Sequence, residues 1–122
     1  MSLKRKNLGI LGEQLAKKLL LNKGYRFLQQ NFRCRLGEID LIFQDKNTLV
    51  FVEVKTRYAE ELSLPEEAIT PPKLKTISRV IDYFYLRYPA LPKLARIDVV
   101  AIQLEQGTLK LASLKHFSNV TG

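Results

Sequence analysis

The chain has 122 residues, 46% of them hydrophobic and 26% charged, values typical of a single soluble globular domain with a substantial core. No run of about 18 apolar residues is present, which excludes a hydrophobic membrane-spanning helix, so no membrane partner is expected. The only cysteine, Cys34, excludes an intrachain disulfide and a thiolate zinc site. With no secretory leader at the start of the sequence, we expect the reducing cytoplasm as its location.

The formal net charge of +8 is distributed unevenly along the chain. Residues 1–35 contain nine lysines and arginines against one acid, Glu13, whereas residues 36–61 contain six acids and three bases. An acidic cluster inside a basic chain indicates a cation site within a surface that attracts polyanions. The alternative is a solvated surface with a basic terminus, and charge alone does not separate the two.

The first predicted element is a helix over roughly 8–23, where leucines recur at helical spacing until Gly24 ends the pattern. Gly12 falls on its apolar face, where a missing side chain would permit close backbone packing. Apolar and β-branched runs then predict strands at 25–34, 39–43, 49–54, 96–104 and 108–114. The acidic region 59–69 is expected to be a loop.

A second helix is predicted from Thr70-Pro71-Pro72, which supplies a capping hydroxyl and prolines for the first turn. It should end near Tyr88-Pro89. The element order is therefore αβββαββ, one layered α/β domain with helices packed across a mixed sheet.

A tight turn is predicted at 45–48, between the strands at 39–43 and 49–54. With its two central residues as the loop, antiparallel pairing places Asp40 opposite Glu53 and Glu38 opposite Lys55. Side chains alternate along a strand, so these four share one face. The other face is expected to be apolar and to consist of Ile39, Leu41, Phe43, Val50, Val52 and Val54.

Directly opposed carboxylates destabilise a strand pair unless a proton or a cation lies between them. A hard divalent cation such as Mg²⁺ prefers carboxylate and carbonyl oxygens, so Asp40 and Glu53 indicate a metal site. Lys55 beside it could orient or deprotonate a water and balance charge on a phosphate. The alternative is an ordinary ion-pair face, in which Glu38 pairs with Lys55 and Asp40 is solvated.

The spacing of Asp40 and Glu53-Val54-Lys55 resembles the D…(D/E)-x-K signature of restriction-endonuclease-like nucleases. Over nearly its full length the chain is similar to the YraN-like family of bacterial predicted endonucleases, relatives of archaeal Holliday-junction resolvases. The segments that carry this resemblance are Gly12-Glu13, Gly24-Tyr25, Asn31-Phe32-Arg33, 37–42, 51–57, Pro65 with Glu67-Ala68, Thr70-Pro71 with Lys73, and 96–100.

The resemblance implies a restriction-endonuclease-like core in one domain spanning 1–122. It also implies a Mg²⁺- or Mn²⁺-dependent endonuclease that acts on DNA. The resolvase relatives suggest branched DNA as the substrate and a homodimer as the assembly. It implies that Asp40 and Glu53 hold the metal, with the Val54 carbonyl as a candidate third ligand. Lys55 would serve the water, and Glu13 would complete the site. From the residues alone, Glu13 is equally a surface partner of Lys17, one helical turn later.

Other charged side chains have supporting roles in this interpretation. We expect Glu38 to tether Lys55 from outside the metal's ligand set, and residues 1–7 to form a flexible basic arm. The second helix carries a basic stripe that suits phosphate contacts, formed by Lys73, Thr76, Arg79, Tyr83 and Arg87; a solvated helix face is the alternative. The candidate nucleic-acid contacts are Lys4, Arg5, Lys6, Arg33, Arg35, Arg57, Lys73 and Arg79.

Two other functional classes fit the same residues. One is a non-catalytic nucleic-acid-binding accessory module that keeps the nuclease fold, and the other is a metal-independent scaffold whose acids form ion pairs. No residue pattern here is typical of base-edge recognition, so a nucleic acid would be recognised by shape. Cys34 and the single histidine, His116, are expected to be structural.

Overall fold

The computed structural model describes residues 3–61 and 69–121, and their side chains from residue 7 onward. In these ranges the elements are α1 (Leu3–Asn22), β1 (Arg26–Cys34), β2 (Gly37–Asp45), β3 (Thr48–Tyr58), α2 (Pro71–Arg87), β4 (Leu94–Leu104) and β5 (Leu111–Phe117). The strands form one sheet in the order β1-β2-β3-β4-β5. Neighbours are antiparallel except β3 and β4, which are parallel and joined through α2. The predicted order αβββαββ and the restriction-endonuclease-like architecture are confirmed.

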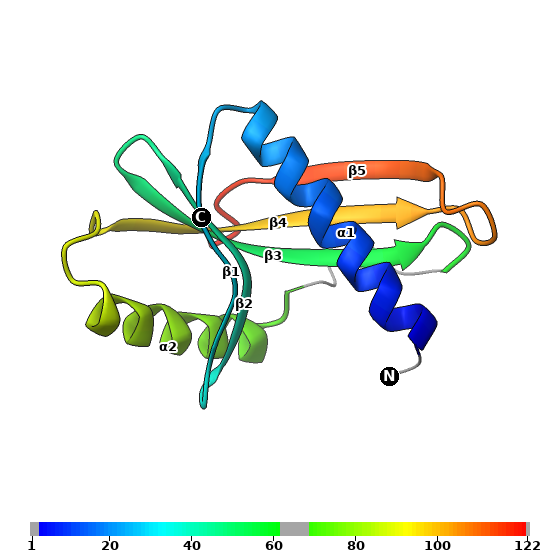
Figure 1. Cartoon of the computed structure of the whole chain (residues 1–122). Coiled ribbons are helices and arrows are strands. Elements are labelled where there is room, and N and C mark those ends of the chain that lie inside the picture. The colour runs from blue at the N-terminus through cyan, green and yellow to red at the C-terminus, as the bar shows by residue number, and fades with distance from the viewer. Residues whose placement is uncertain (1–2, 62–68, 122) are drawn as a thin grey trace.

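The two helices cover opposite faces of the sheet, so the domain has three layers (Figure 1). On the α1 side, a core cluster joins helix residues such as Ala16 and Leu20 to Leu41 and Val52 of the central strands. On the α2 side, Val80 and Phe84 pack against Phe51 and neighbouring sheet residues. A strand that is apolar on both faces must lie between two layers, and β2 and β3 have that character through most of their length.

Helix ends follow the local signals. Thr70 caps α2 by accepting a hydrogen bond from the backbone N–H of Lys73, and Pro71 occupies the first turn. At the end of α1, Gly24 adopts the left-handed φ of +89° and Tyr25 N–H returns to the carbonyl of Leu20, a typical glycine-based helix end.

The start of α1 differs from the prediction. The helix begins at Leu3 and not near residue 8, so the backbone of the expected basic arm is helical from that residue on. Leucine, lysine and arginine are all strong helix formers, and no proline interrupts the segment. The side chains of Lys4, Arg5 and Lys6 lie outside the described part of the structure.

The predicted register of β2 and β3 is confirmed where the strands pair. Asp45 pairs with Thr48 across the turn, and the ladder continues to Leu41 opposite Val52. It ends there, so Asp40 and Glu53 lie where the strands separate. The expected placement of Ile39 beside Leu41 is wrong, because Ile39 packs in the α2-side cluster. Strand alternation therefore breaks at Asp40.

Gly12 brings α1 against β3. A Cβ built on Gly12 would lie 1.8 Å from Oγ1 of Thr56, so no side chain fits at this position. The expectation of close backbone packing is confirmed, and the contact sets the depth at which the next residue, Glu13, reaches the sheet.

The last hairpin is shifted from its prediction. Strand β5 begins at Leu111, three residues later than expected, because residues 105–110 form a closed loop. The backbone N–H of Leu109 donates to the carbonyl of Glu105, and Leu109 itself has a left-handed φ of 58°. Residues 62–68 of the predicted acidic loop lie outside the described residues.

A buried ionic network ties β5 to β4. Asp98 is fully buried and lies 3.1 Å from Arg96 Nε, 2.8 Å from His116 Nε2 and 2.8 Å from the backbone N of Asn119. Although burial opposes ionisation, these hydrogen bonds hold the pKa of Asp98 below its usual value. His116 therefore contributes to folding, as expected, and not to the acidic cluster.

Candidate active site

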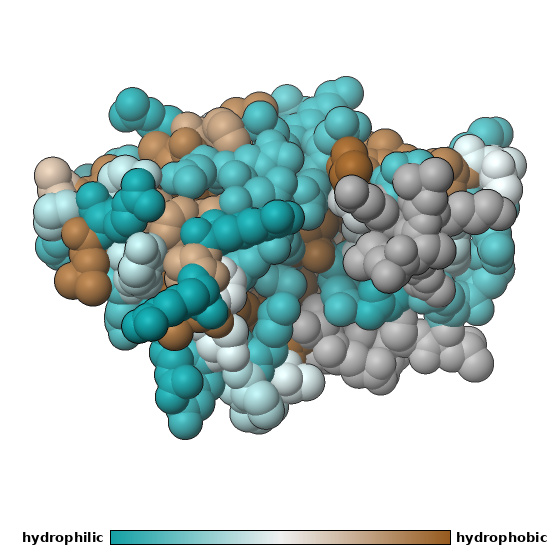
Figure 2. All heavy atoms as spheres, turned by 60° about the horizontal axis from the view of Figure 1, so that its bottom comes forward, coloured by the Kyte–Doolittle hydropathy of each residue, from teal (hydrophilic) through white to brown (hydrophobic). Residues whose placement is uncertain are grey.

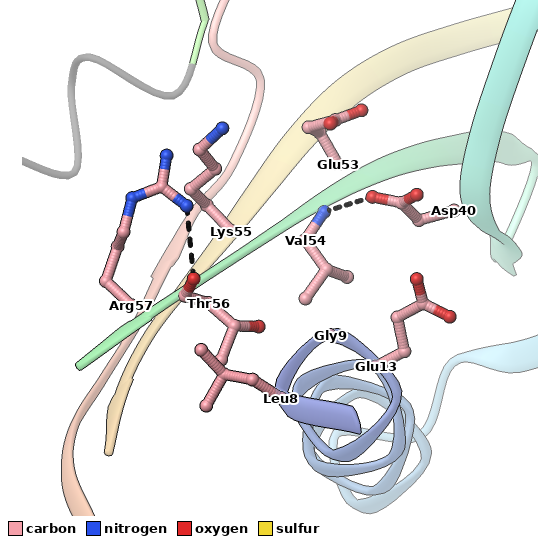
Figure 3. A pocket seen from close by; sticks show the side chains of 9 residues that line it. All are labelled: Leu8, Gly9, Glu13, Asp40, Glu53, Val54, Lys55, Thr56 and Arg57. Carbon is pink, nitrogen blue, oxygen red and sulfur yellow. Dashed lines mark hydrogen bonds between the residues drawn. The ribbon is translucent and has the colours of Figure 1, made fainter. Parts of the chain in front are cut away.

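The acidic residues of the sequence motif line a pocket of about 210 Å³ between α1 and the separated ends of β2 and β3 (Figure 3). The pocket is lined by Leu8, Gly9, Glu13, Asp40, Glu53, Val54, Lys55, Thr56 and Arg57. In Figure 3, Glu53 and Lys55 extend to one side of β3, and Glu13 approaches from α1 on the other. The structure thus brings together Asp40, Glu53, Lys55 and Glu13 from three elements.

Asp40 occupies the point where the β2–β3 ladder stops. Its Oδ2 accepts a hydrogen bond of 2.8 Å from the backbone N–H of Val54, which replaces a bond that the strand partner would otherwise supply. Burial raises the pKa of Asp40 above its usual value, and the bond from Val54 opposes that rise.

The pKa of Glu53 is raised further than that of Asp40. Its side chain is only 12% exposed. Burial, followed by the charge of Asp40, raises the pKa of Glu53 to about 7. Burial and the charge of Asp40 thus both disfavour ionised Glu53, and the charges of Lys73 and Lys55 oppose them.

Lys55 lies in the same pocket, half-buried. Burial, with the charge of Arg57 next, lowers the pKa of Lys55 below its usual value, while Glu53 opposes that change. A lysine with a lowered pKa exchanges protons more readily near neutral pH.

Glu13 is a pocket residue and not the surface partner of Lys17. The Lys17 ammonium lies 3.9 Å from the ring centre of Phe27. Burial and the charge of Asp40 raise the pKa of Glu13, and a hydrogen bond with the Asn31 side chain opposes this. The helical spacing alone could not decide this, because the close approach at Gly12 determines where Glu13 points.

Glu38 does not tether Lys55, contrary to expectation. It pairs across the β1–β2 hairpin with Arg33, whose Nε lies 3.1 Å from Glu38 Oε2. The predicted Glu38–Lys55 pairing requires a ladder that continues past Leu41, and the strands have already separated there.

Lys73 approaches the site from α2. Its Nζ lies 3.4 Å from Oε1 of Glu53. The sequence placed Lys73 among the phosphate contacts but gave no signal of this ion pair, because the parallel crossover that brings α2 over β3 is a long-range feature. The sequence analysis also did not predict the hydrogen bond between Asn31 and Glu13. Asparagine is unfavourable in a strand, so Asn31 could have signalled an irregularity in β1, where it has a left-handed φ of 53°.

The other basic candidates have varied surroundings. Arg35 and Arg79 are exposed, whereas Arg57 donates from Nη1 to the carbonyl of Thr56 and pairs with Glu61. Tyr83 is half-buried, its ring centre 6.2 Å from that of Phe32. Only part of the predicted stripe on α2 is therefore available to a ligand.

Hydrophilic atoms cover much of the α2-side view, and hydrophobic atoms gather at the end where α2 stops (Figure 2). Leu86, in the last turn of α2, is 80% exposed, and Leu94, the first residue of β4, is 65% exposed. Neither helix, over its described residues, is long and apolar enough to cross a membrane.

The carboxylates are not arranged as a complete metal cage. Within 3–61 and 69–121, no three His, Cys, Asp or Glu side chains converge closely enough to hold an ion. Asp40 and Glu53, two carboxylates in one pocket, still match the partial ligand sets through which proteins bind Mg²⁺.

Comparison with known proteins gives one family throughout. A UPF0102 protein of Syntrophus aciditrophicus is 46% identical over 108 residues, covering 88% of this chain and 84% of the relative. A UPF0102 protein of Chlorobium phaeobacteroides is 41% identical over 116 residues, covering 93% and 92%. The family model described as "Uncharacterised protein family UPF0102" matches residues 12–102, which include every pocket acid. The chain therefore belongs to family UPF0102, the YraN-like family that its motifs resemble.

Proposed function

We propose that this protein is a metal-dependent endonuclease that hydrolyses phosphodiester bonds in nucleic acid, with structured or branched DNA as its substrate class. The observation that carries the proposal is the pair of buried, mutually repelling acids, Asp40 and Glu53, in one pocket with Lys55. Two carboxylates that repel each other destabilise the metal-free protein, and a cation-dependent reaction would explain why both are present.

The donor set suits Mg²⁺ or Mn²⁺. Asp40 and Glu53 would supply carboxylate oxygens and Val54 a backbone carbonyl, and the remaining positions would go to water and phosphate oxygens. A divalent ion held there supplies Lewis-acid chemistry: it lowers the pKa of a bound water and neutralises charge on the phosphate.

Two side chains of the protein would then act on the water and the phosphate. Lys55, with its lowered pKa, holds the water in place, accepts or relays its proton, and balances negative charge on the reacting phosphate. Glu13, from the opposite side of β3, is a second proton acceptor because its raised pKa brings its titration closer to neutrality. Neither role requires a histidine, and His116 lies in the Asp98 network.

The proposed substrate follows from charge and shape. Arg35 and Arg79 are exposed cations, and binding through such side chains releases counterions, so affinity should fall steeply with salt. The sequence has no residue pattern typical of base-edge recognition, which favours the shape of the DNA over its base sequence as the recognised feature. A homodimer in the cytoplasm would place two pockets on two strands of a branched DNA.

A second candidate is a nucleic-acid-binding module without catalysis. Two observations favour it: Glu53 is already paired with Lys73, and the described acids form no three-ligand cluster. In that case the acids and lysines would serve only to hold the strand ends together.

The test is a panel of linear, flapped and four-way DNAs incubated with Mg²⁺ or Mn²⁺. Wild type is compared with Lys55→Ala, Asp40→Asn and the control Lys75→Ala, which removes an exposed lysine of α2. Cleavage by wild type and the control, but by neither site variant, supports the proposal. Equal cleavage by wild type and Lys55→Ala would identify a contaminating nuclease. Binding without cleavage by any form would favour the second candidate.

A further inference from the structure

The ion pair between Lys73 and Glu53 joins an exposed side chain to a buried one. Lys73 is 46% exposed and Glu53 12%, with Nζ and Oε1 3.4 Å apart. The backbone of Lys73 is fixed, because its N–H donates to the N-cap oxygen of Thr70. Its head group already borders solvent, so its long side chain can leave the pair without disturbing the packing of α2.

Lys73 acts on both acids of the pocket. It makes the 3.4 Å ion pair with Glu53, and its charge also favours the ionised form of Asp40 against the effect of burial. The charge that a metal would neutralise is thus partly neutralised from α2.

An ammonium and a divalent ion held by the same carboxylate repel each other. A Mg²⁺ ion lies about 2.0–2.1 Å from a ligand oxygen. With Nζ at 3.4 Å from the same glutamate, the two cations would be close neighbours in a half-buried pocket, where their repulsion is weakly screened.

We propose that Lys73 is a displaceable counter-cation: it holds Glu53 in the metal-free protein, and entry of a divalent ion releases its ammonium toward the phosphate backbone of the nucleic acid. This inference rests on the proposed metal site. In the metal-free protein Glu53 is engaged by Lys73, so the inference requires Glu53 to exchange one cation for another. It also makes metal and nucleic acid cooperative ligands, because one binding event prepares the cation for the other.

The first experiment is calorimetric titration of the full chain with Mg²⁺ at pH 8.5, above the pKa of about 7 that Glu53 has beside its lysine. Removing the competing ammonium in Lys73→Gln should tighten Mg²⁺ binding by roughly tenfold, the size of an ordinary coupling between sites. The control Lys75→Gln removes the same charge two residues away on α2 and should bind as wild type does. Unchanged affinity in Lys73→Gln overturns the inference and leaves the metal site standing.

The second experiment measures binding of a four-way DNA at constant ionic strength, with Mg²⁺ or with EDTA, in an Asp40-intact, cleavage-deficient Lys55→Ala background. Mg²⁺ should raise the DNA affinity of this protein several-fold, and adding Lys73→Gln should abolish most of that increase. An equal increase with and without Lys73 overturns the inference. If no form binds Mg²⁺ at all, both the proposed function and this inference fail, an outcome distinct from the unchanged affinity above.

Discussion

The carboxylate of Asp40 accepts a 2.8 Å hydrogen bond from the backbone N–H of Val54, one residue beyond Glu53, where the β2–β3 ladder has ended. A single side chain therefore both completes the backbone hydrogen bonding of β3 and provides an acid of the pocket. Any substitution of Asp40 must be interpreted with both roles in mind.

Asp40→Asn should separate these two roles. The amide oxygen can still accept from Val54, while the negative charge that repels Glu53 is lost. We expect Mg²⁺ binding and cleavage to be lost together and the metal-free protein to unfold at a higher temperature, by a few degrees. Thermal melts in EDTA and calorimetric titration measure both quantities. A variant that melts lower than wild type in EDTA, or that still binds Mg²⁺ normally, would contradict this account.

Lys55→Ala should affect the reaction without affecting assembly of the complex. Removing one positioned electrostatic group typically costs about 10²–10³ in rate. Single-turnover cleavage at saturating protein should fall by at least that factor, while DNA and Mg²⁺ affinities stay within about twofold of wild type. A loss of Mg²⁺ affinity in place of a loss of rate would place Lys55 in the structure of the site and not in its chemistry.

The stability of the metal-free protein should fall as pH rises from about 5 to 8. The pKa of Glu53 is about 7 in the folded protein against an ordinary value of 4.5. Between these values the folded protein binds a proton that the unfolded chain has lost, so its contribution is complete below about pH 4.5 and lost above about pH 7. The effect is roughly 3 kcal/mol at most, and urea unfolding in EDTA measures it.

Glu53→Gln should flatten this pH dependence, and Asp82→Asn, which changes an exposed acid of α2, should not. Asp98 does not contribute to this pH dependence. Its pKa is lowered in the folded protein, so the stability that it provides is lost only in acid, below this pH range. A slope that is the same in wild type and Glu53→Gln would mean that the proton binds elsewhere.

Gly12→Ala should destabilise the domain and Gly9→Ala should stabilise it. A Cβ on Gly12 would collide with Thr56, whereas one on Gly9 has no neighbour within 4 Å. Both substitutions bring the same gain in helix propensity, up to about 1 kcal/mol, so their difference isolates the collision. We expect Gly12→Ala to be net destabilising by about 1–3 kcal/mol in urea unfolding. If both variants gain stability, α1 can move away from β3 without cost.

Much of the fold follows from local features of the sequence. The cap at Thr70, the stop at Gly24 and the turn at 45–48 depend on residues within a few positions of each other. The register of β2 and β3 follows from that turn, since a two-residue loop leaves only one antiparallel pairing. These features could be predicted because short-range geometry determines them.

The candidate site was predictable only in part. The strand register predicted that Asp40 and Glu53 lie together. It did not predict that the β2–β3 ladder ends at Leu41, and for this reason the expected pairing of Glu38 with Lys55 was wrong. The face occupied by Ile39 was missed for the same reason, because alternation holds only while a strand stays regular.

Residues distant in the chain met only through tertiary packing. Glu13 reaches the pocket because Gly12 lets α1 lie against Thr56, and Lys73 reaches Glu53 because α2 crosses the sheet between two parallel strands. The network of Asp98, Arg96 and His116 likewise depends on β5 returning beside β4. Periodicity and turn chemistry specify which residues share an element and a face, whereas the distance between two elements is set by how their side chains fill the space between them.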